Sequence, residues 1–131
     1  MPVDPRQPYD PDNIFARILR GEIPCAKVYE DEWALAFNDI HPQAPTHIQV
    51  IPKGAYVSWD DFSERANAEE IAGYIRAIGN VARQLGVVDQ GYRLLANCGP
   101  DSHQEVAHLH VHLFAGRKMG HLLVPTNAIP Q

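Results

Sequence analysis

The most informative segment of this sequence is AHLHVHLF, at residues 107–114. Side chains of a β-strand alternate between its two faces, so a strand here points His108, His110 and His112 one way and the leucine and valine side chains between them the other. The leucine–valine face is typical of a strand packed on an apolar core. Because three imidazoles in a row neither fill such a core nor stabilise a strand, the histidine face predicts a chemical site.

Hydrophobic periodicity predicts four further strands and two helices in the rest of the chain. The strands are expected at residues 27–30, 33–38, 46–51 and 92–96, a short helix at about 13–20, and a long helix at 68–85. Asn67, followed three residues later by Glu70, matches a capping box at the start of the long helix, and Gly86 ends it. Residues 53–66 are expected to be irregular and anchored by three aromatic side chains, Tyr56, Trp59 and Phe62.

These short elements and their short connections predict an α+β fold, a five-stranded antiparallel sheet with one long and one short helix. A single sheet covered by one helix leaves a face or an edge without cover. We therefore expect a homodimer, with the sheet extended across the two copies.

Length, charge and cysteine content narrow the class of protein further. The 131 residues predict one domain, at 13–131, after a loose lead-in at 1–12 that carries four prolines and three aspartates. Eleven Lys and Arg against sixteen Asp and Glu give a net charge of −5, which disfavours a general nucleic-acid or acidic-membrane binder. Two cysteines form no Cys-x-x-Cys pattern, and neither a signal peptide nor a membrane span is recognisable, so we expect a cytoplasmic protein.

Two kinds of chemistry compete for the histidine face. One is a metal site, but a strand places the Cα atoms of His108 and His112 about 13 Å apart, so two neighbouring histidines would need a further ligand such as His47. The other is nucleophilic attack on phosphorus, because neutral imidazole is a good nucleophile near pH 7. In that interpretation the central His110 attacks, and an acceptor such as a backbone carbonyl holds its second ring nitrogen.

The loop at residues 97–106 leads directly into the histidine segment. Its glycine, proline and polar residues suit either a plain turn or a loop that points backbone N–H groups at an anion. The side-chain amides of Asn97 and Gln104 are the best placed to contact such an anion as well, and either amide could instead cap its own loop.

The segment HLHVHLF at residues 108–114 matches the signature of the histidine triad (HIT) superfamily, and the sequence resembles its Hint-like branch of purine nucleoside phosphoramidases. The resemblance covers roughly residues 13–120. It is carried by the triad and by IF at 14–15, GEIP at 21–24, FNDI at 37–40, PQAPTH at 42–47, IPK at 51–53, LLAN at 94–97 and GR at 116–117.

The resemblance implies a homodimer that hydrolyses purine nucleoside phosphoramidates and related AMP or GMP conjugates, without a metal or other cofactor. It assigns His110 as the nucleophile of a nucleotidyl–histidine intermediate, with His112 on the phosphate, His108 positioning His110, and His47 completing the set. Further residues are implied to bind substrate. They are Asp39 at the ribose hydroxyls, Phe15, Ile18 and Ile40 around the base, and Asn97 with the N–H groups near Glu105 and Val106 at the phosphate.

The sequence departs from the family pattern at two places. Glu105 stands where many relatives have a serine that assists the leaving group, and a carboxylate there could shuttle a proton to an amine or point away from the phosphate. Asn13 and Ala16 stand where some relatives carry a zinc-binding cysteine pair. Two other functions stay open at this point: a nucleotide-binding or protein-interaction module with little turnover, and a zinc-binding protein.

Overall fold

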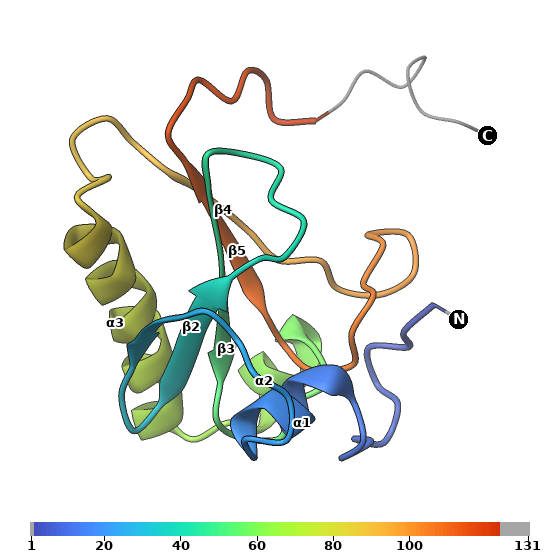
Figure 1. Ribbon diagram of the computed structural model, residues 1–131. Helices are drawn as coiled ribbons and strands as arrows, with labels where there is room; N and C mark the ends of the chain where they lie inside the picture. Colours follow the sequence, from blue (N-terminus) through green and yellow to red (C-terminus); the bar gives the residue numbers. More distant parts are fainter. Residues whose placement is uncertain (1, 124–131) are drawn as a thin grey trace.

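A five-stranded antiparallel sheet forms the centre of the computed structural model, which describes residues 2–123 (Figure 1). Its strands, in spatial order, are β1 (Lys27–Glu30), β2 (Ala34–Asn38), β3 (Thr46–Pro52), β5 (Val111–Ala115) and β4 (Arg93–Leu95). The expected α+β class is confirmed, and the expected strands agree with the structure to within one residue at each end, except at the start of β5. Among the described residues, no helix has the length and apolar character needed to cross a membrane.

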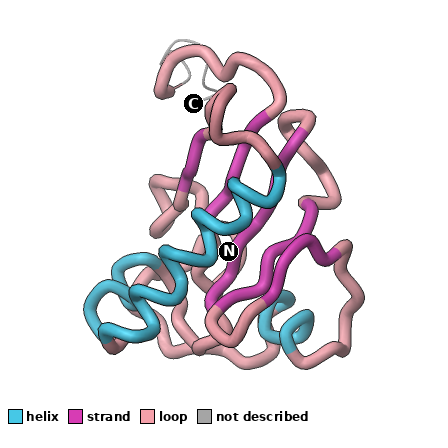
Figure 2. Tube along the Cα trace, turned by 90° about the vertical axis from the view of Figure 1, so that its left-hand side faces the viewer, coloured by secondary structure: helices cyan, strands magenta, loops and turns pink. Residues whose placement is uncertain are grey.

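Helix α3 (Ala68–Leu85) lies against one face of the sheet, where it contacts β2 and β3 (Figure 2). The capping box expected at its start is present, because Asn67 accepts from the backbone N–H of Glu70 and the Glu70 side chain accepts from the backbone N–H of Asn67. Its end is at Gly86, whose φ of 70° is the left-handed conformation that glycine adopts without strain. The expected long helix is therefore confirmed at both ends.

The apolar core lies between α3 and the sheet. Leu109, Val111 and Leu113 are buried there, which confirms the prediction for the leucine–valine face. They pack with side chains of β3 and α3, namely Ile48, Val50, Tyr74, Ile78 and Val81. The histidines between them consequently belong to the opposite face of the sheet.

The segment at 53–66 is not wholly irregular, as the sequence had suggested. It contains helix α2 (Trp59–Arg65), whose N-cap Ser58 accepts from the backbone N–H of Asp61. Phe62 and Tyr56 are buried as expected, but Trp59 is 41% exposed and does not anchor the segment in the core.

The histidine strand is shorter than predicted, since β5 begins at Val111 and not at residue 107. The ladder between β3 and β5 ends at the pair Val50 and Val111, and β4 is too short to extend it. Before that point the chain is held by the backbone N–H of Leu109, which donates to the Tyr56 carbonyl over 2.8 Å. His108 and His110 therefore precede the strand, and His112 lies on it.

The N-terminal residues contact the body of the protein and do not form the loose lead-in that the sequence suggested. Val3 is 5% exposed, and the buried Ser58 hydroxyl donates to the Pro5 carbonyl over 2.8 Å. This segment leads into the short helix α1 (Ile14–Leu19), whose N-cap is Asn13.

Candidate active site

The candidate active site is a cavity of about 460 Å³ on the sheet face opposite α3. Antiparallel pairing of β3 with β5 places Gln49 opposite His112 and His47 opposite Phe114. The residues that line the cavity are Phe15, Asp39, His41, Gln43, His47, Gln49, Leu95, Asn97, His103, Glu105, Val106, His110, His112 and Phe114. Two of the three triad histidines, His110 and His112, thus face the same cavity as His47.

Hydrogen bonding assigns the protons of His110. Its Nδ1 lies 2.8 Å from the carbonyl oxygen of His108, and because a carbonyl only accepts, Nδ1 carries the proton. Nε2 is therefore the nitrogen with the free lone pair. Burial lowers the pKa of His110, against the opposing effects of the His108 carbonyl and the charges of Glu105 and Asp39, so the ring is neutral near pH 7.

His108 is fully buried and bonded at both ring nitrogens. Its Nε2–H donates to the carbonyl of Pro52 over 2.8 Å, which leaves Nδ1 to accept from the hydroxyl of Tyr9 over 2.6 Å. Burial lowers the pKa of His108 to about 4. This side chain has no free nitrogen for a ligand, and its position suits the expected role of supporting His110.

His47 and His112 are linked by a chain of hydrogen bonds that determines which ring nitrogen of each carries a proton. The backbone N–H of Gln43 donates to Nδ1 of His47 over 3.1 Å, so Nε2 of His47 carries a proton and donates to Nδ1 of His112 over 2.9 Å. His112 is then left with a proton on Nε2, as a donor on a side chain that lines the cavity. Burial, with His110 and His47 adding to it, lowers the pKa of His112 to about 4.

Asp39 carries the negative charge that lies beside His47 and His112. Burial acts to raise the pKa of its carboxyl, but the backbone N–H of His41 and the Gln49 amide, at 2.8 and 2.7 Å, and the nearby histidines hold that pKa below its usual value. The carboxylate therefore stays ionised and can accept from hydroxyl groups.

Gln49 is a site residue that sequence reasoning did not assign. Strand alternation placed it on the same face as His47, which was the available signal, but nothing in the sequence paired its amide with Asp39. Its Oε1 is the one buried side-chain nitrogen or oxygen atom, within residues 2–123, that has no hydrogen-bond partner.

The loop that precedes the triad contributes Asn97, Glu105 and Val106 to the cavity wall, as expected. Glu105 pairs with His103 over 2.9 Å, and His103 has a φ of 60°. Asn97 donates its amide to the Ser102 carbonyl over 2.6 Å, so it also braces its own loop.

Gln104 does not reach the cavity wall. Its buried amide nitrogen donates to the carbonyls of Val57 and Val106, and its oxygen accepts from the backbone N–H of Gly99. All of its polar atoms are used to hold the loop, which is the second of the two roles considered from the sequence.

The apolar residues expected around the base are only partly brought together. Phe15 of α1 lines the cavity and lies edge-on to the His110 ring, with ring centroids 5.1 Å apart. Ile18 packs instead in a small cluster with Phe15 and Phe37, and Ile40 is 84% exposed. Neither isoleucine lines the cavity.

Three side chains that line the cavity are also of the types that bind metal ions. Asp39, His47 and His112 each offer a ligand atom, and the three atoms lie within 4.8 Å of one another. The two imidazole nitrogens, however, are already joined by a hydrogen bond of 2.9 Å. An ion could bind here only after the proton on Nε2 of His47 has left.

Together, the fold and the site define a protein with a row of neutral, buried or half-buried histidines beside the Asp39 carboxylate. The family model of the HIT domain matches residues 20–119, and the chain belongs to this family.

Relatives match the chain along most of its length. It is 67% identical to an uncharacterized 13.2 kDa HIT-like protein of Azospirillum brasilense, over 88% of this chain and 94% of that one. It is 42% identical to the purine nucleoside phosphoramidase of Escherichia coli, over 86% of this chain and 93% of that one. A solved HIT family hydrolase from Clostridium thermocellum superposes with a TM-score of 0.79 at 37% identity, covering 86% and 97% of the two chains.

Proposed function

We propose that this protein hydrolyses purine nucleoside phosphoramidates and related nucleotidyl conjugates through a covalent intermediate on His110. The observation that carries the proposal is the hydrogen bond from Nδ1 of His110 to the His108 carbonyl, which leaves an unprotonated Nε2 in the cavity. The similarity to a purine nucleoside phosphoramidase supports the substrate class.

In the first step Nε2 of His110 attacks phosphorus. The new P–N bond forms as the bond to the leaving amine breaks, and the amine departs with the electron pair and takes up a proton from solvent. Nε2–H of His112 donates to a phosphate oxygen as negative charge increases there. The Asn97 amide and the backbone N–H groups at Glu105 and Val106 complete the phosphate contacts.

In the second step water attacks the nucleotidyl–histidine and the P–Nε2 bond breaks. The lone pair returns to His110, the nucleoside monophosphate leaves, and the water proton passes to solvent. The Asp39 carboxylate accepts from the ribose hydroxyls, while Phe15 contacts the base. Donors that the protein's own hydrogen bonds already orient, such as Nε2–H of His112, need no rearrangement during either step.

Replacement of the nucleophile gives the test of this proposal. We expect His110→Asn to lower turnover of an adenosine phosphoramidate by at least about 1,000-fold, because no other ring nitrogen in the triad is both free and unprotonated. His108→Asn should only slow the reaction, since its ring does not touch the substrate. Intact mass should show an AMP adduct on wild-type protein, quenched during turnover, and none on His110→Asn.

The same experiment separates the alternatives. Normal turnover by His110→Asn would contradict the mechanism. Tight AMP binding by wild type without turnover or adduct would support a binding module. Activity that disappears with a chelator and returns with zinc would support the metal interpretation, for which the cluster of Asp39, His47 and His112 is the relevant observation.

We further propose a cytoplasmic location and no nucleic-acid partner. Cys25 and Cys98 are both free thiols, which suits a reducing compartment. The net charge of −5 gives no general attraction for a polyanion, so the substrate phosphate has to be held by the local donors of the site.

A further inference from the structure

The hydroxyl of Tyr9 reaches the first histidine of the triad from outside the stretch that matches the family. Its oxygen is 2.6 Å from Nδ1 of His108, and the two rings meet edge to face with centroids 5.6 Å apart. The family match begins only at residue 20. An N-terminal segment outside the stretch matched by the family model thus contacts a buried residue of the candidate active site.

The direction of this hydrogen bond follows from the other ring nitrogen. Nε2 of His108 donates to the Pro52 carbonyl, so Nδ1 is the acceptor and the Tyr9 hydroxyl is the donor. Burial raises the pKa of Tyr9, which keeps this hydroxyl protonated. The ring of His108 is therefore fixed at both ends, with one of the two bonds supplied by Tyr9.

The position of His108 matters because its carbonyl oxygen orients His110. Residues 107–110 precede β5, so no strand ladder holds this carbonyl. The backbone is fixed there by the bond from Leu109 to Tyr56 and by the two bonds of the His108 ring. A shift of that ring would move the acceptor that keeps the proton of His110 on Nδ1.

The segment around Tyr9 is itself held in place. The buried Ser58 hydroxyl donates to the Pro5 carbonyl over 2.8 Å, and the Arg20 guanidinium donates to the Pro11 carbonyl over 2.7 Å. Anchors on both sides of Tyr9 restrict its ring to the neighbourhood of His108, so the hydroxyl is presented without a large entropic cost.

We propose that Tyr9 is a positioning residue for the nucleophile: it fixes the ring of His108, and through the His108 carbonyl it keeps Nε2 of His110 unprotonated and directed at the substrate. This inference rests on the proposed role of His110. It adds the N-terminal segment to the elements that determine the rate of the reaction.

The test compares Tyr9→Phe with Tyr29→Phe. Tyr29 is a matched control, because its hydroxyl also makes a part-buried bond, to Asp31 over 2.8 Å, but it lies away from the cavity. We expect Tyr9→Phe to lower kcat and the rate of adduct formation by about 10-fold with KM nearly unchanged, since a misplaced reacting group affects the chemical step. Tyr29→Phe should leave both constants as in wild type.

Ring ¹⁵N NMR spectra supply a second measurement. The signals of the His108 ring nitrogens would not change on replacement of Tyr9 if Tyr9 had a merely structural role. In wild type, His108 should carry its proton on Nε2 with a hydrogen-bonded Nδ1, and Tyr9→Phe should shift that Nδ1 signal while leaving His47 unchanged. Equal kcat for the two Phe variants, or a wild-type His108 protonated on Nδ1, would overturn the proposal. The spectrum of wild type decides even if Tyr9→Phe fails to fold. It needs no turnover, so it is independent of the result for His110→Asn.

Discussion

Hydrogen-bond donors and acceptors assign one protonation state to each of His47, His108, His110 and His112. The need for a carbonyl behind His110 could be predicted from chemistry, because a nucleophilic imidazole requires its other nitrogen to be occupied. The carbonyl of His108 fills that role. Tyr9 and Gln49 could not be predicted in the same way, since Tyr9 meets His108 across 99 residues of sequence and the Gln49 amide meets Asp39 only in the folded sheet.

These protonation states predict that activity is lost at acid pH only below the ordinary pKa of imidazole. Attack requires neutral His110, and burial holds its pKa below 6.5, so kcat/KM should decline as the pH falls with a midpoint below pH 6.5. A pH–rate profile at constant ionic strength measures this. A midpoint at or above pH 6.5 would show that His110 is not held neutral by its surroundings.

Lowered histidine pKa values also make the protein less stable as the pH falls. His108 and His112 have pKa values lowered to about 4, so below pH 6.5 the unfolded chain binds protons that the folded chain does not. Between pH 6.5 and about 4 the free energy of unfolding should fall by about 1.4 kcal/mol per pH unit for the fully buried His108, and by less for the half-buried His112. Urea denaturation at pH 7 and pH 5 measures the change.

At the scale of the elements, hydrophobic periodicity and capping residues predicted the secondary structure correctly where a stretch of sequence determines its own conformation. The capping box at Asn67 and the glycine end at Gly86 placed α3 correctly. Helix α2 was missed, although Ser58 three residues before Asp61 was a usable N-cap signal, because its aromatic residues suggested anchors rather than a helical stripe. The start of β5 could not be predicted, since it depends on where the neighbouring strands end.

Replacement by alanine should change the free energy of unfolding in opposite directions at two glycines of α3, Gly73 and Gly79. A Cβ at Gly73 would overlap the Trp33 indole, whereas a Cβ at Gly79 would meet only the flexible end of Arg83 at 3.0 Å. We expect Gly73→Ala to lower the free energy of unfolding by about 1–3 kcal/mol through overpacking. Gly79→Ala should raise it by about 0.5–1 kcal/mol, because alanine favours the helix. Chemical denaturation of the two variants measures both changes, and a stabilising Gly73→Ala would mean that Trp33 does not pack on α3.

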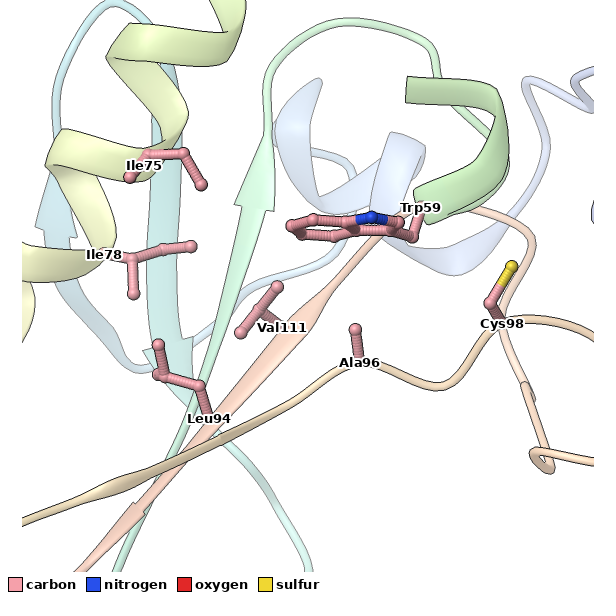
Figure 3. A pocket seen from close by; sticks show the side chains of 7 residues that line it. All are labelled: Trp59, Ile75, Ile78, Leu94, Ala96, Cys98 and Val111. Carbon is pink, nitrogen blue, oxygen red and sulfur yellow. The ribbon is translucent and has the colours of Figure 1, made fainter. Parts of the chain in front are cut away.

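At the scale of the whole molecule, the feature that the single chain leaves unexplained is an apolar groove beside β4. Its volume is about 400 Å³, and side chains of α2, α3, β4, β5 and the segment after β4 converge on it: Trp59, Ile75, Ile78, Leu94, Ala96, Cys98 and Val111 (Figure 3). Leu94 and Ile75 are nearly half exposed. Among residues 2–123, β4 is paired only with β5, and no described segment pairs with its outer edge, which lies next to this groove.

We propose that a second copy of the chain covers this face. A twofold axis beside β4 would pair the two open edges and bury the two grooves against each other, extending the sheet across a homodimer. One contact of this kind removes both an unpaired strand edge and an exposed apolar patch, which a small monomer otherwise leaves in water. This arrangement is the one expected from a single sheet covered on one face.

Leu94→Glu tests the dimer, because burying two unpaired carboxylates in one interface costs several kcal/mol. We expect light scattering to give twice 14.6 kDa for wild type and 14.6 kDa for Leu94→Glu. Val88→Glu is the control, since Val88 is an exposed apolar side chain outside the groove and the same charge there should leave the dimer intact. A wild-type protein that is monomeric at micromolar concentration would mean that the groove is filled in another way, and that the sheet ends at β4.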